Sequence, residues 1–280
     1  MTTCAADGRP GAFSVLMSVY AGERSVWLDQ ALASLAASTI WPTEIILVED
    51  GPLGRDLHEV IDRYRAVLPL KLLQLERNVG LGPALAAGLS LCREEWVARF
   101  DTDDLIEPDR FERQLSYLGE HPDVDIVGGW IQEFEADPGQ ERGRVRRVPE
   151  DHRAVLAYAR RRNPFNHMTV MFRRAMAMAH GGYQGERLYE DYALWVRMLQ
   201  GGAVAANIPG VLVKARAGAG MFERRGGMAY VRSEVAVQWS FFRCGFIGPG
   251  RLALNLAQRL PVRILPGTVR RWIYQRFLRA

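Results

Sequence analysis

The chain has 280 residues, of which 48% are hydrophobic and 24% charged, a balance typical of a soluble globular protein. Its apolar runs are too short to cross a bilayer, and residues 1–10 lack the basic-then-apolar pattern of a signal peptide. The three cysteines are far apart and form no Cys-x-x-Cys pair, which disfavours a disulfide framework and a zinc site. We therefore expect a cytoplasmic protein.

The net charge of +4 is unevenly distributed along the chain. Residues 235–280 hold eight arginines and no acidic residue, which leaves 28 of the 36 basic side chains against all 32 acids in residues 1–234. Such a basic, apolar-rich tail favours attachment to an anionic membrane surface over nucleic-acid binding. The alternative is a helical tail that folds back on the core.

Strand-like and helix-like segments alternate in the first half of the chain. The strands are predicted at residues 13–20, 44–50, 70–75 and 96–101, and the helices at 27–35, 57–67, 82–91 and 110–118. Ser25 is the expected N-cap of the first helix. This β-α-β order with apolar strands predicts an α/β fold with a mostly parallel, Rossmann-like sheet flanked by helices.

The second half is less regular. Strands are predicted at residues 124–134, 168–172 and 204–214, and helices at 152–162 and 189–199. From residue 228 the tail is expected to be helical, with breaks at Gly248-Pro249, Pro261 and Pro266.

Three carboxylates, Asp101, Asp103 and Asp104, directly follow the strand predicted from residue 96. Carboxylates this close repel one another, so one would take up a proton unless a cation lies among them. Oxygen ligands suit Mg²⁺ or Mn²⁺, which commonly keep some waters and bind substrate phosphates. The alternative is an acidic turn before the helix that begins near Pro108.

Polar residues also stand at or just after the ends of other predicted strands, namely Tyr20, Asp50 and Asn78. Ligands of parallel sheets bind beyond the carboxyl ends of the strands, so this convergence favours a binding site. The loop at residues 21–24 lacks the Gly-x-Gly-x-x-Gly of dinucleotide-binding proteins, and the chain has no P-loop. A nicotinamide enzyme is therefore not expected.

Five ordered motifs resemble glycosyltransferase family 2, whose members have the GT-A fold. They are residues 18–23 (SVYAGE), 48–51 (VEDG), 77–80 (RNVG), 101–104 (DTDD) and 190–191 (ED). Each motif is weak alone, but five in this order are a specific signal covering about residues 13–216. The resemblance implies inverting transfer of one sugar from a nucleotide sugar, UDP- or dTDP-linked, with Mn²⁺ or Mg²⁺ as cofactor.

The resemblance also implies roles for individual residues. Nucleotide and donor binding falls to Val19, Tyr20, Glu23, Asp50, Arg77, Asn78, Gly80, Asp101, Gly129 and Arg216. The metal ligands are Asp103, with Asp101 and Asp104. Asp191, at the start of its helix and expected to be exposed, is the base that accepts the proton of a sugar hydroxyl, and Glu190 is its substitute.

Residues 166–173 (NHMTVMFR) and the arginine-rich tail resemble a narrower group, which builds bacterial exopolysaccharides of the amylovoran type. His167 and Trp130 are assigned to the acceptor site, although His167 can equally be a core histidine bonded to the backbone. Many relatives place a histidine after the last strand, where this chain has Arg216, so either Arg216 contacts phosphate or the metal lacks one ligand. The Gln-x-x-Arg-Trp motif of processive synthases is missing.

These observations predict an N-terminal extension (residues 1–12), a GT-A catalytic domain (13–220) and a helical, basic C-terminal region (221–280). The expected acceptor is a saccharide, lipid-linked and at the inner face of the cell membrane. Two alternatives stay open. A sugar nucleotidyltransferase would need a glycine-rich, arginine-containing loop at residues 21–24, and a nucleotide-sugar-binding partner subunit would lack turnover.

Overall fold

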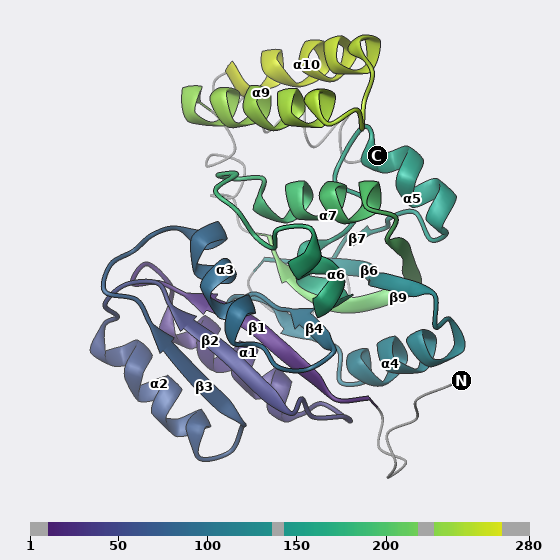
Figure 1. Ribbon diagram of the computed structural model, residues 1–280. Coiled ribbons are helices and arrows are strands. Elements are labelled where there is room, and N and C mark those ends of the chain that lie inside the picture. The colour runs from purple at the N-terminus through teal and green to yellow at the C-terminus, as the bar shows by residue number, and fades with distance from the viewer. Residues whose placement is uncertain (1–10, 136–142, 218–226, 265–280) are drawn as a thin grey trace.

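The computed structural model describes residues 11–135, 143–217 and 227–264 (Figure 1). One sheet runs through the molecule in the strand order β3-β2-β1-β4-β8-β6-β9-β5, with β7 paired to β6. The strands are β1 Phe13–Val19, β2 Glu44–Glu49, β3 Leu70–Gln74, β4 Trp96–Arg99, β5 Leu105–Ile106, β6 Val124–Phe134, β7 Val145–Arg146, β8 Met171–Arg173 and β9 Val204–Arg216. The helices are α1 Ser25–Ala36, α2 Arg55–Arg65, α3 Leu81–Leu91, α4 Arg110–Glu120, α5 His152–Ala159, α6 Arg174–Ala179, α7 Glu190–Gln200, α9 Met228–Arg243 and α10 Pro249–Ile264, and a 3₁₀ turn spans His167–Thr169.

The sheet changes character at its middle. The four strands β3, β2, β1 and β4 pair in parallel, as the β-α-β order of the sequence predicts. Beyond β4 the sheet is mixed, because β8 runs antiparallel to both β4 and β6, whereas the long β6 and β9 are parallel. Carboxyl ends and amino ends therefore meet near the boundary between β4 and β8, where a binding site can form.

Helices cover both faces of the sheet (Figure 1). Along β1, Val15 and Met17 join the apolar cluster that includes buried residues of α1, α2 and α4, whereas Leu16 joins the cluster with α3 and α7. Alternate residues of a strand point to opposite faces, so a strand that is apolar throughout is buried on both sides. Burial on both faces of the sheet therefore explains the uninterrupted apolar runs of the sequence.

Three local predictions were wrong. Ser25 is the first residue of α1 and not its N-cap, a place taken by Arg24 without a side-chain cap. The strand predicted at residues 168–172 begins at Met171, because the 3₁₀ turn precedes it. Pro261 lies inside α10 and does not break it. Proline removes one backbone donor, a loss that this helix tolerates while its preceding turns pack against α9. Pro266 lies outside the described residues.

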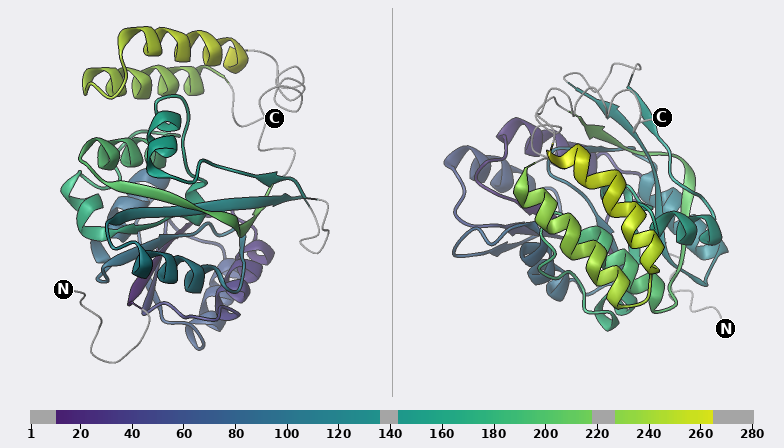
Figure 2. Two further views of the ribbon diagram at one scale, coloured as in Figure 1. Left: turned by 90° about the vertical axis from the view of Figure 1, so that its right-hand side faces the viewer. Right: turned by 90° about the horizontal axis from the view of Figure 1, so that it is seen from above.

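Helices α9 and α10 form a hairpin that packs on the core beside α7, and Figure 2 shows the two helices side by side at one end of the molecule. Val237 and Phe241 of α9 are buried, and the ring centroids of Phe241 and Tyr192 of α7 lie 4.9 Å apart. Residues 228–264 therefore fold back on the core, which was the alternative to membrane attachment. Residues 265–280 lie outside the described residues, as does the expected domain boundary near residue 220. Within the described segments, no helix is long and apolar enough to cross a membrane.

Candidate functional site

Asp101 lies at the centre of the site, just beyond the carboxyl end of β4. Its Oδ1 is 2.5 Å from a guanidinium nitrogen of Arg99, and its Oδ2 is 2.9 Å from Nε2 of His167. Burial alone would raise the pKa of Asp101, but the charges of Arg99 and His167 outweigh burial and hold this pKa below its usual range. Asp101 is therefore an ionised carboxylate at neutral pH.

Asp103 and Asp104 behave in the opposite way. Burial, together with the negative charges of Asp101 and Glu23, raises the pKa of Asp103 to about 7. Burial and the charges of Asp103 and Asp101 raise the pKa of Asp104 well above its usual value, although its Oδ1 accepts a 2.7 Å hydrogen bond from the backbone N–H of Arg216. This is the repulsion that the sequence predicts for three neighbouring carboxylates.

The chemistry of these oxygen donors fits Mn²⁺ or Mg²⁺, and such a cation would relieve the repulsion between Asp103 and Asp104. In the described part of the chain, no three acidic, histidine or cysteine side chains converge closely enough to make a metal site by themselves. A cation held here would thus take further oxygen ligands from water or from substrate phosphates.

The sequence analysis missed Arg99, which contacts Arg110 at the start of α4. Both are fully buried, and Arg110 donates a 2.9 Å hydrogen bond to the carbonyl oxygen of Arg99. The guanidinium of Arg99 donates to the carbonyl oxygen of Phe100. Arg99 stands in β4 between apolar neighbours. A charged residue inside an apolar strand is the sequence signal that could have identified it, because buried charge requires a partner.

His167 connects the aspartate-rich loop with the start of α7. Its Nε2 contacts Asp101, and its Nδ1 lies 3.9 Å from Oδ2 of Asp191. Burial would lower the pKa of His167, but the charges of Asp101 and Asp191 raise it to about 9, so the ring is positively charged at neutral pH. The ring nitrogens therefore face two carboxylates, unlike those of a core histidine bonded to the backbone.

Glu190 and Asp191 begin α7, as predicted, but both side chains are buried, with 9% and 7% exposed, and not exposed as the sequence suggested. For Glu190 the reason is the close approach of α3, where a Cβ added to Gly82 would lie 3.3 Å from Cβ of Glu190. Burial and the charge of Asp191 raise the pKa of Glu190. Of the two carboxylates, Asp191 is the one that lies 3.9 Å from His167.

Asp50 fixes the loop that follows β3. Its two carboxylate oxygens accept hydrogen bonds from the backbone N–H groups of Val79 (2.7 Å) and Gly80 (3.0 Å), and its carbonyl oxygen accepts one from the side chain of Asn78. Gly51 has φ +88°, and a Cβ there would lie 2.6 Å from the backbone nitrogen of Asn78. The structure thus brings the predicted residues of two motifs together, while the exposed Arg77 is outside these contacts.

The loop after β1 meets the aspartate-rich loop. Val19 is buried and Tyr20 is 47% exposed. Glu23 accepts a 3.1 Å hydrogen bond from the hydroxyl of Thr102, a residue that the sequence analysis did not single out. These contacts place the first and fourth strand ends beside each other, as the parallel pairing of β1 and β4 requires.

Arg216, at the end of β9, lies against the aspartate-rich loop. Its Nε donates to the carbonyl oxygen of Asp103 (3.0 Å), and another guanidinium nitrogen donates to Gln30 (2.7 Å). The guanidinium also lies over the rings of Trp27 and Phe134, with centroids at 5.0 and 4.6 Å. A cavity of about 300 Å³ opens beside it, lined by Arg24, Val26, Trp27, Gln30, Glu135 and Arg216.

The predicted acceptor residue Trp130 and donor residue Gly129 lie on β6. Gly129 is buried, and its backbone groups bond the hydroxyl of Thr169 and the side chain of Asn166, so that it anchors the 3₁₀ turn carrying His167. The ring of Trp130 is half-buried, with the guanidinium of Arg147 5.0 Å above it.

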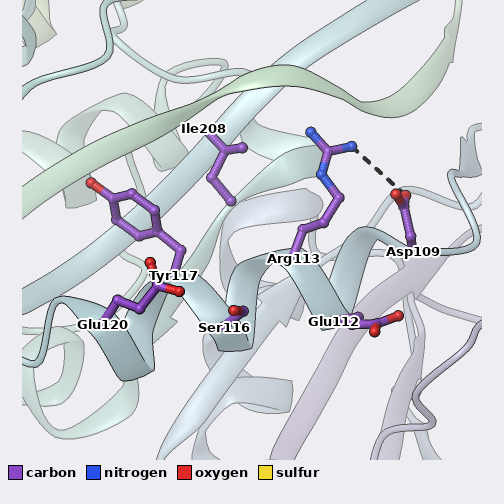
Figure 3. Close-up of a pocket in the computed structure, with 7 residues that line it drawn as sticks. All are labelled: Asp109, Glu112, Arg113, Ser116, Tyr117, Glu120 and Ile208. Atoms are coloured by element: carbon purple, nitrogen blue, oxygen red, sulfur yellow. Dashed lines mark ion pairs between the residues drawn. The ribbon is translucent and has the colours of Figure 1, made fainter.

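A second cavity, of about 510 Å³, lies along α4 (Figure 3). The ion pair of Arg113 and Asp109, 3.7 Å apart, borders it at one end, and Ile208 of β9 faces it from the sheet. None of the site residues predicted from the sequence lines this cavity. The acidic loop and the start of α7 therefore remain the candidate active site.

Comparison with known proteins decides the family. The sequence model of glycosyl transferase family 2 matches residues 14–179. The chain belongs to glycosyltransferase family 2. Like other members of this family, the protein is a glycosyltransferase, which confirms the enzyme class predicted from the five motifs.

Two curated members of the family resemble the chain over almost its full length. A UDP-Gal:α-D-GlcNAc-diphosphoundecaprenol β-1,3-galactosyltransferase of Escherichia coli is 40% identical, over 95% of this chain and 96% of its own. The amylovoran biosynthesis glycosyltransferase AmsE of Erwinia amylovora is 41% identical, over 94% of this chain and 98% of its own. The predicted likeness to amylovoran-type glycosyltransferases is thereby confirmed.

Solved structures of two proteins with low sequence identity share the fold. TarS of S. aureus, crystallised with UDP-GlcNAc, has a TM-score of 0.63 at 18% identity and covers 90% of this chain and 72% of its own. The mannosyltransferase PcManGT of Pyrobaculum calidifontis, in complex with GDP-Man and Mn²⁺, has a TM-score of 0.63 at 16% identity and covers 89% and 69%. The predicted GT-A fold with a helical C-terminal region is confirmed.

Proposed function

We propose that this glycosyltransferase adds one sugar from a UDP-linked donor to a lipid-linked saccharide in the synthesis of a bacterial exopolysaccharide. The observation that carries the proposal is the position of His167 between Asp101 and Asp191. One imidazole ring thus contacts Asp101 of the candidate donor site and lies 3.9 Å from Asp191, the candidate base. The specificity of the E. coli relative supports galactose as the first donor sugar to test and a diphosphate-linked GlcNAc as the acceptor.

Donor binding is assigned to the loops at the ends of β1, β2 and β4. Asp103, with Asp104 and Asp101, would hold Mn²⁺ or Mg²⁺, which neutralises the charge that develops on the departing nucleoside diphosphate. Asp101 is already paired with Arg99 and His167, so Asp103 is the strongest candidate for direct coordination. Arg216, beside Asp103, takes the place of the missing histidine as a phosphate contact.

Asp191 is the proposed general base. It accepts the proton of an acceptor hydroxyl while that oxygen attacks the anomeric carbon and the bond from this carbon to the diphosphate oxygen breaks. A base in this position contributes roughly 10²–10⁴ in rate, and one displacement inverts the anomeric configuration. Asp191 is preferred to Glu190 because it is the carboxylate that lies 3.9 Å from His167, the residue that also contacts Asp101.

Calorimetry with UDP, dTDP, GDP and CMP, with and without Mn²⁺, tests the donor site. We expect UDP binding that needs Mn²⁺ and that disappears in Asp103→Ala. Binding of none of these nucleotides in a metal-dependent manner would refute the assignment.

Transfer from UDP-Gal to a lipid diphosphate-linked GlcNAc tests the base. Asp191→Asn should lose at least 100-fold in kcat and keep nucleotide binding. Asp29→Asn, which removes a carboxylate 2.7 Å from Arg63 on the surface, is the matched control and should keep full activity. Nucleotide binding without transfer in the unmodified enzyme would favour the alternative of a binding subunit.

Membrane attachment of the basic tail is a separate part of the proposal. Such attachment explains how a chain whose described helices do not span a membrane can reach a lipid-linked acceptor. The full chain should bind vesicles containing anionic lipid, and salt or removal of residues 265–280 should release it. Unchanged binding after both treatments would refute this part.

A further inference from the structure

Glu234 of α9 is completely buried, although it is a charged residue. Arg259 of α10 donates to one of its carboxylate oxygens, and a guanidinium nitrogen of Arg263 lies 3.3 Å from the other. The hydroxyl of Tyr189 donates to that second oxygen, and it also lies 3.2 Å from Arg263. A buried carboxylate is tolerated when it is paired and hydrogen-bonded in this way, so the geometry of the cluster is fixed.

Tyr189 is the residue directly before Glu190 and Asp191. It occupies the N-cap position of α7, where it makes no side-chain cap of its own. The preceding residue, Leu188, has φ +71°, which is a left-handed conformation that a leucine rarely adopts. Such a conformation persists where the surroundings hold it, and it is common at active sites. Tyr189, the next residue along the chain, contacts the C-terminal hairpin through Glu234.

We propose that Tyr189 is a positioning residue: its bond to Glu234 lets the hairpin α9–α10 hold the first turn of α7, and with it the carboxylate of Asp191, in the geometry that transfer requires. The inference rests on the proposed role of Asp191 as the base. The hairpin is consequently a functional part of the active site, although it lies outside residues 14–179 that match the family model.

Two other contacts of the site act on residues of α7 itself and not on the residue before it. His167 lies 3.9 Å from Asp191, which is longer than a hydrogen bond, and the close approach of Gly82 concerns Glu190. Neither contact reaches the strained peptide at Leu188. Loss of the Tyr189 hydroxyl therefore removes the bond that joins the residue before Glu190 to the hairpin.

Tyr189→Phe, which removes the hydroxyl and keeps the ring, is the test. We expect a fall of about tenfold in kcat, equivalent to about 1.4 kcal/mol, with the KM for the donor changed by less than about twofold. Hydrogen–deuterium exchange in the peptide spanning residues 186–194 should become faster. Glu234→Gln should also lower kcat. The double variant should be no slower than the slower single variant, because both changes act on the same bond between Tyr189 and Glu234.

Asn255→Ala is the control for a merely structural effect. Asn255 of α10 donates to the carbonyl oxygen of Arg160 and to Gln238, so its loss weakens the docking of the hairpin. Gln238 in turn lies 3.4 Å from Glu234, but at the carboxylate oxygen that does not accept from Tyr189, so the bond of Tyr189 keeps both partners. This variant should lower the melting temperature and keep kcat. An equal fall in kcat in both Asn255→Ala and Tyr189→Phe would overturn the proposal.

The outcomes also separate this inference from the proposed function. If Asp191→Asn transfers sugar as fast as the unmodified enzyme, the role of the base fails, and the exchange of residues 186–194 still reports whether Tyr189 holds the helix. If Asp191→Asn is inactive while Tyr189→Phe matches the unmodified enzyme in kcat and in exchange, the proposed function stands and the positioning role of Tyr189 is refuted.

Discussion

Replacing Asp103 with asparagine should stabilise the metal-free protein, by an amount that grows as the pH rises from 5 to 8. Burial and the charges of Asp101 and Glu23 raise the pKa of Asp103 from 3.8 to about 7 in the folded protein. The folded state therefore binds this proton more tightly than the unfolded chain does. Ionisation of such a carboxyl group lowers the free energy of unfolding progressively as the pH rises from 3.8 to about 7, and the decrease is complete above that range.

The size of the effect follows from the shift. Each pKa unit corresponds to about 1.36 kcal/mol, so the rise to about 7 is equivalent to about 4 kcal/mol in total. About two of these roughly three pKa units fall between pH 5 and pH 7. Solvent screening of the partly exposed side chain reduces the corresponding free energy. We expect Asp103→Asn to gain about 2 kcal/mol relative to the original protein over this window, or a shift of about 4–8 °C in Tm.

Thermal unfolding followed by circular dichroism, in the presence of EDTA at pH 5 and pH 8, measures this difference. Asp62→Asn, at an exposed ion pair with Arg65, is the control, and its effect should not grow with pH because solvent screens the exposed carboxylate. Mn²⁺ at 100 times its Kd should stabilise the original protein by about 2.7 kcal/mol and the variant by less. A variant that is no more stable than the original at pH 8 without metal would refute the reasoning.

Three further substitutions test the framework of the site by denaturant unfolding. Arg99→Met should destabilise the protein by about 3–5 kcal/mol, because the buried Asp101 loses one of its two charged partners and keeps only His167. Asp50→Ala should cost about 1–3 kcal/mol, since two backbone N–H groups lose their acceptor, and a neutral result would mean that this loop is held by other contacts. Gly128→Ala should cost about 1–3 kcal/mol, because the new Cβ would lie 2.3 Å from a side-chain oxygen of β9, whereas Gly119→Ala, with open space around it, should not destabilise.

The strands and helices with a clear hydrophobic pattern were predictable from the sequence. Residues 124–134 form β6 with the predicted bounds, and the four parallel strands differ from their predictions by two residues or fewer. The two-residue strands β5 and β7 were missed, because segments this short have no periodicity. Their pairing depends on the strands beside them, which sequence pattern does not encode.

The candidate site was predicted as a set of residues but not as a geometry. The aspartates and the Glu190-Asp191 pair stand next to each other in the sequence and form recognisable motifs. The contact of His167 with Asp101 joins residues 66 positions apart, and that of Tyr189 with Glu234 joins residues 45 positions apart. Local spacing carries no information on such pairs, so burial of Asp191 and the involvement of the C-terminal hairpin emerged from the tertiary structure.

The change from parallel to mixed pairing between β4 and β8 has a consequence for recombination between related enzymes. The carboxylates of the aspartate-rich loop belong to the parallel half of the sheet, and the turn bearing His167 leads directly into β8 of the mixed half. A chimera joined between these halves would inherit the loops at the ends of β1, β2 and β4 from one parent and the turn bearing His167, with α7, from the other. Such an exchange is compatible with the fold where both parents keep the pairing partners Ala98 and Met171 and the contact of His167 with Asp101 across the junction.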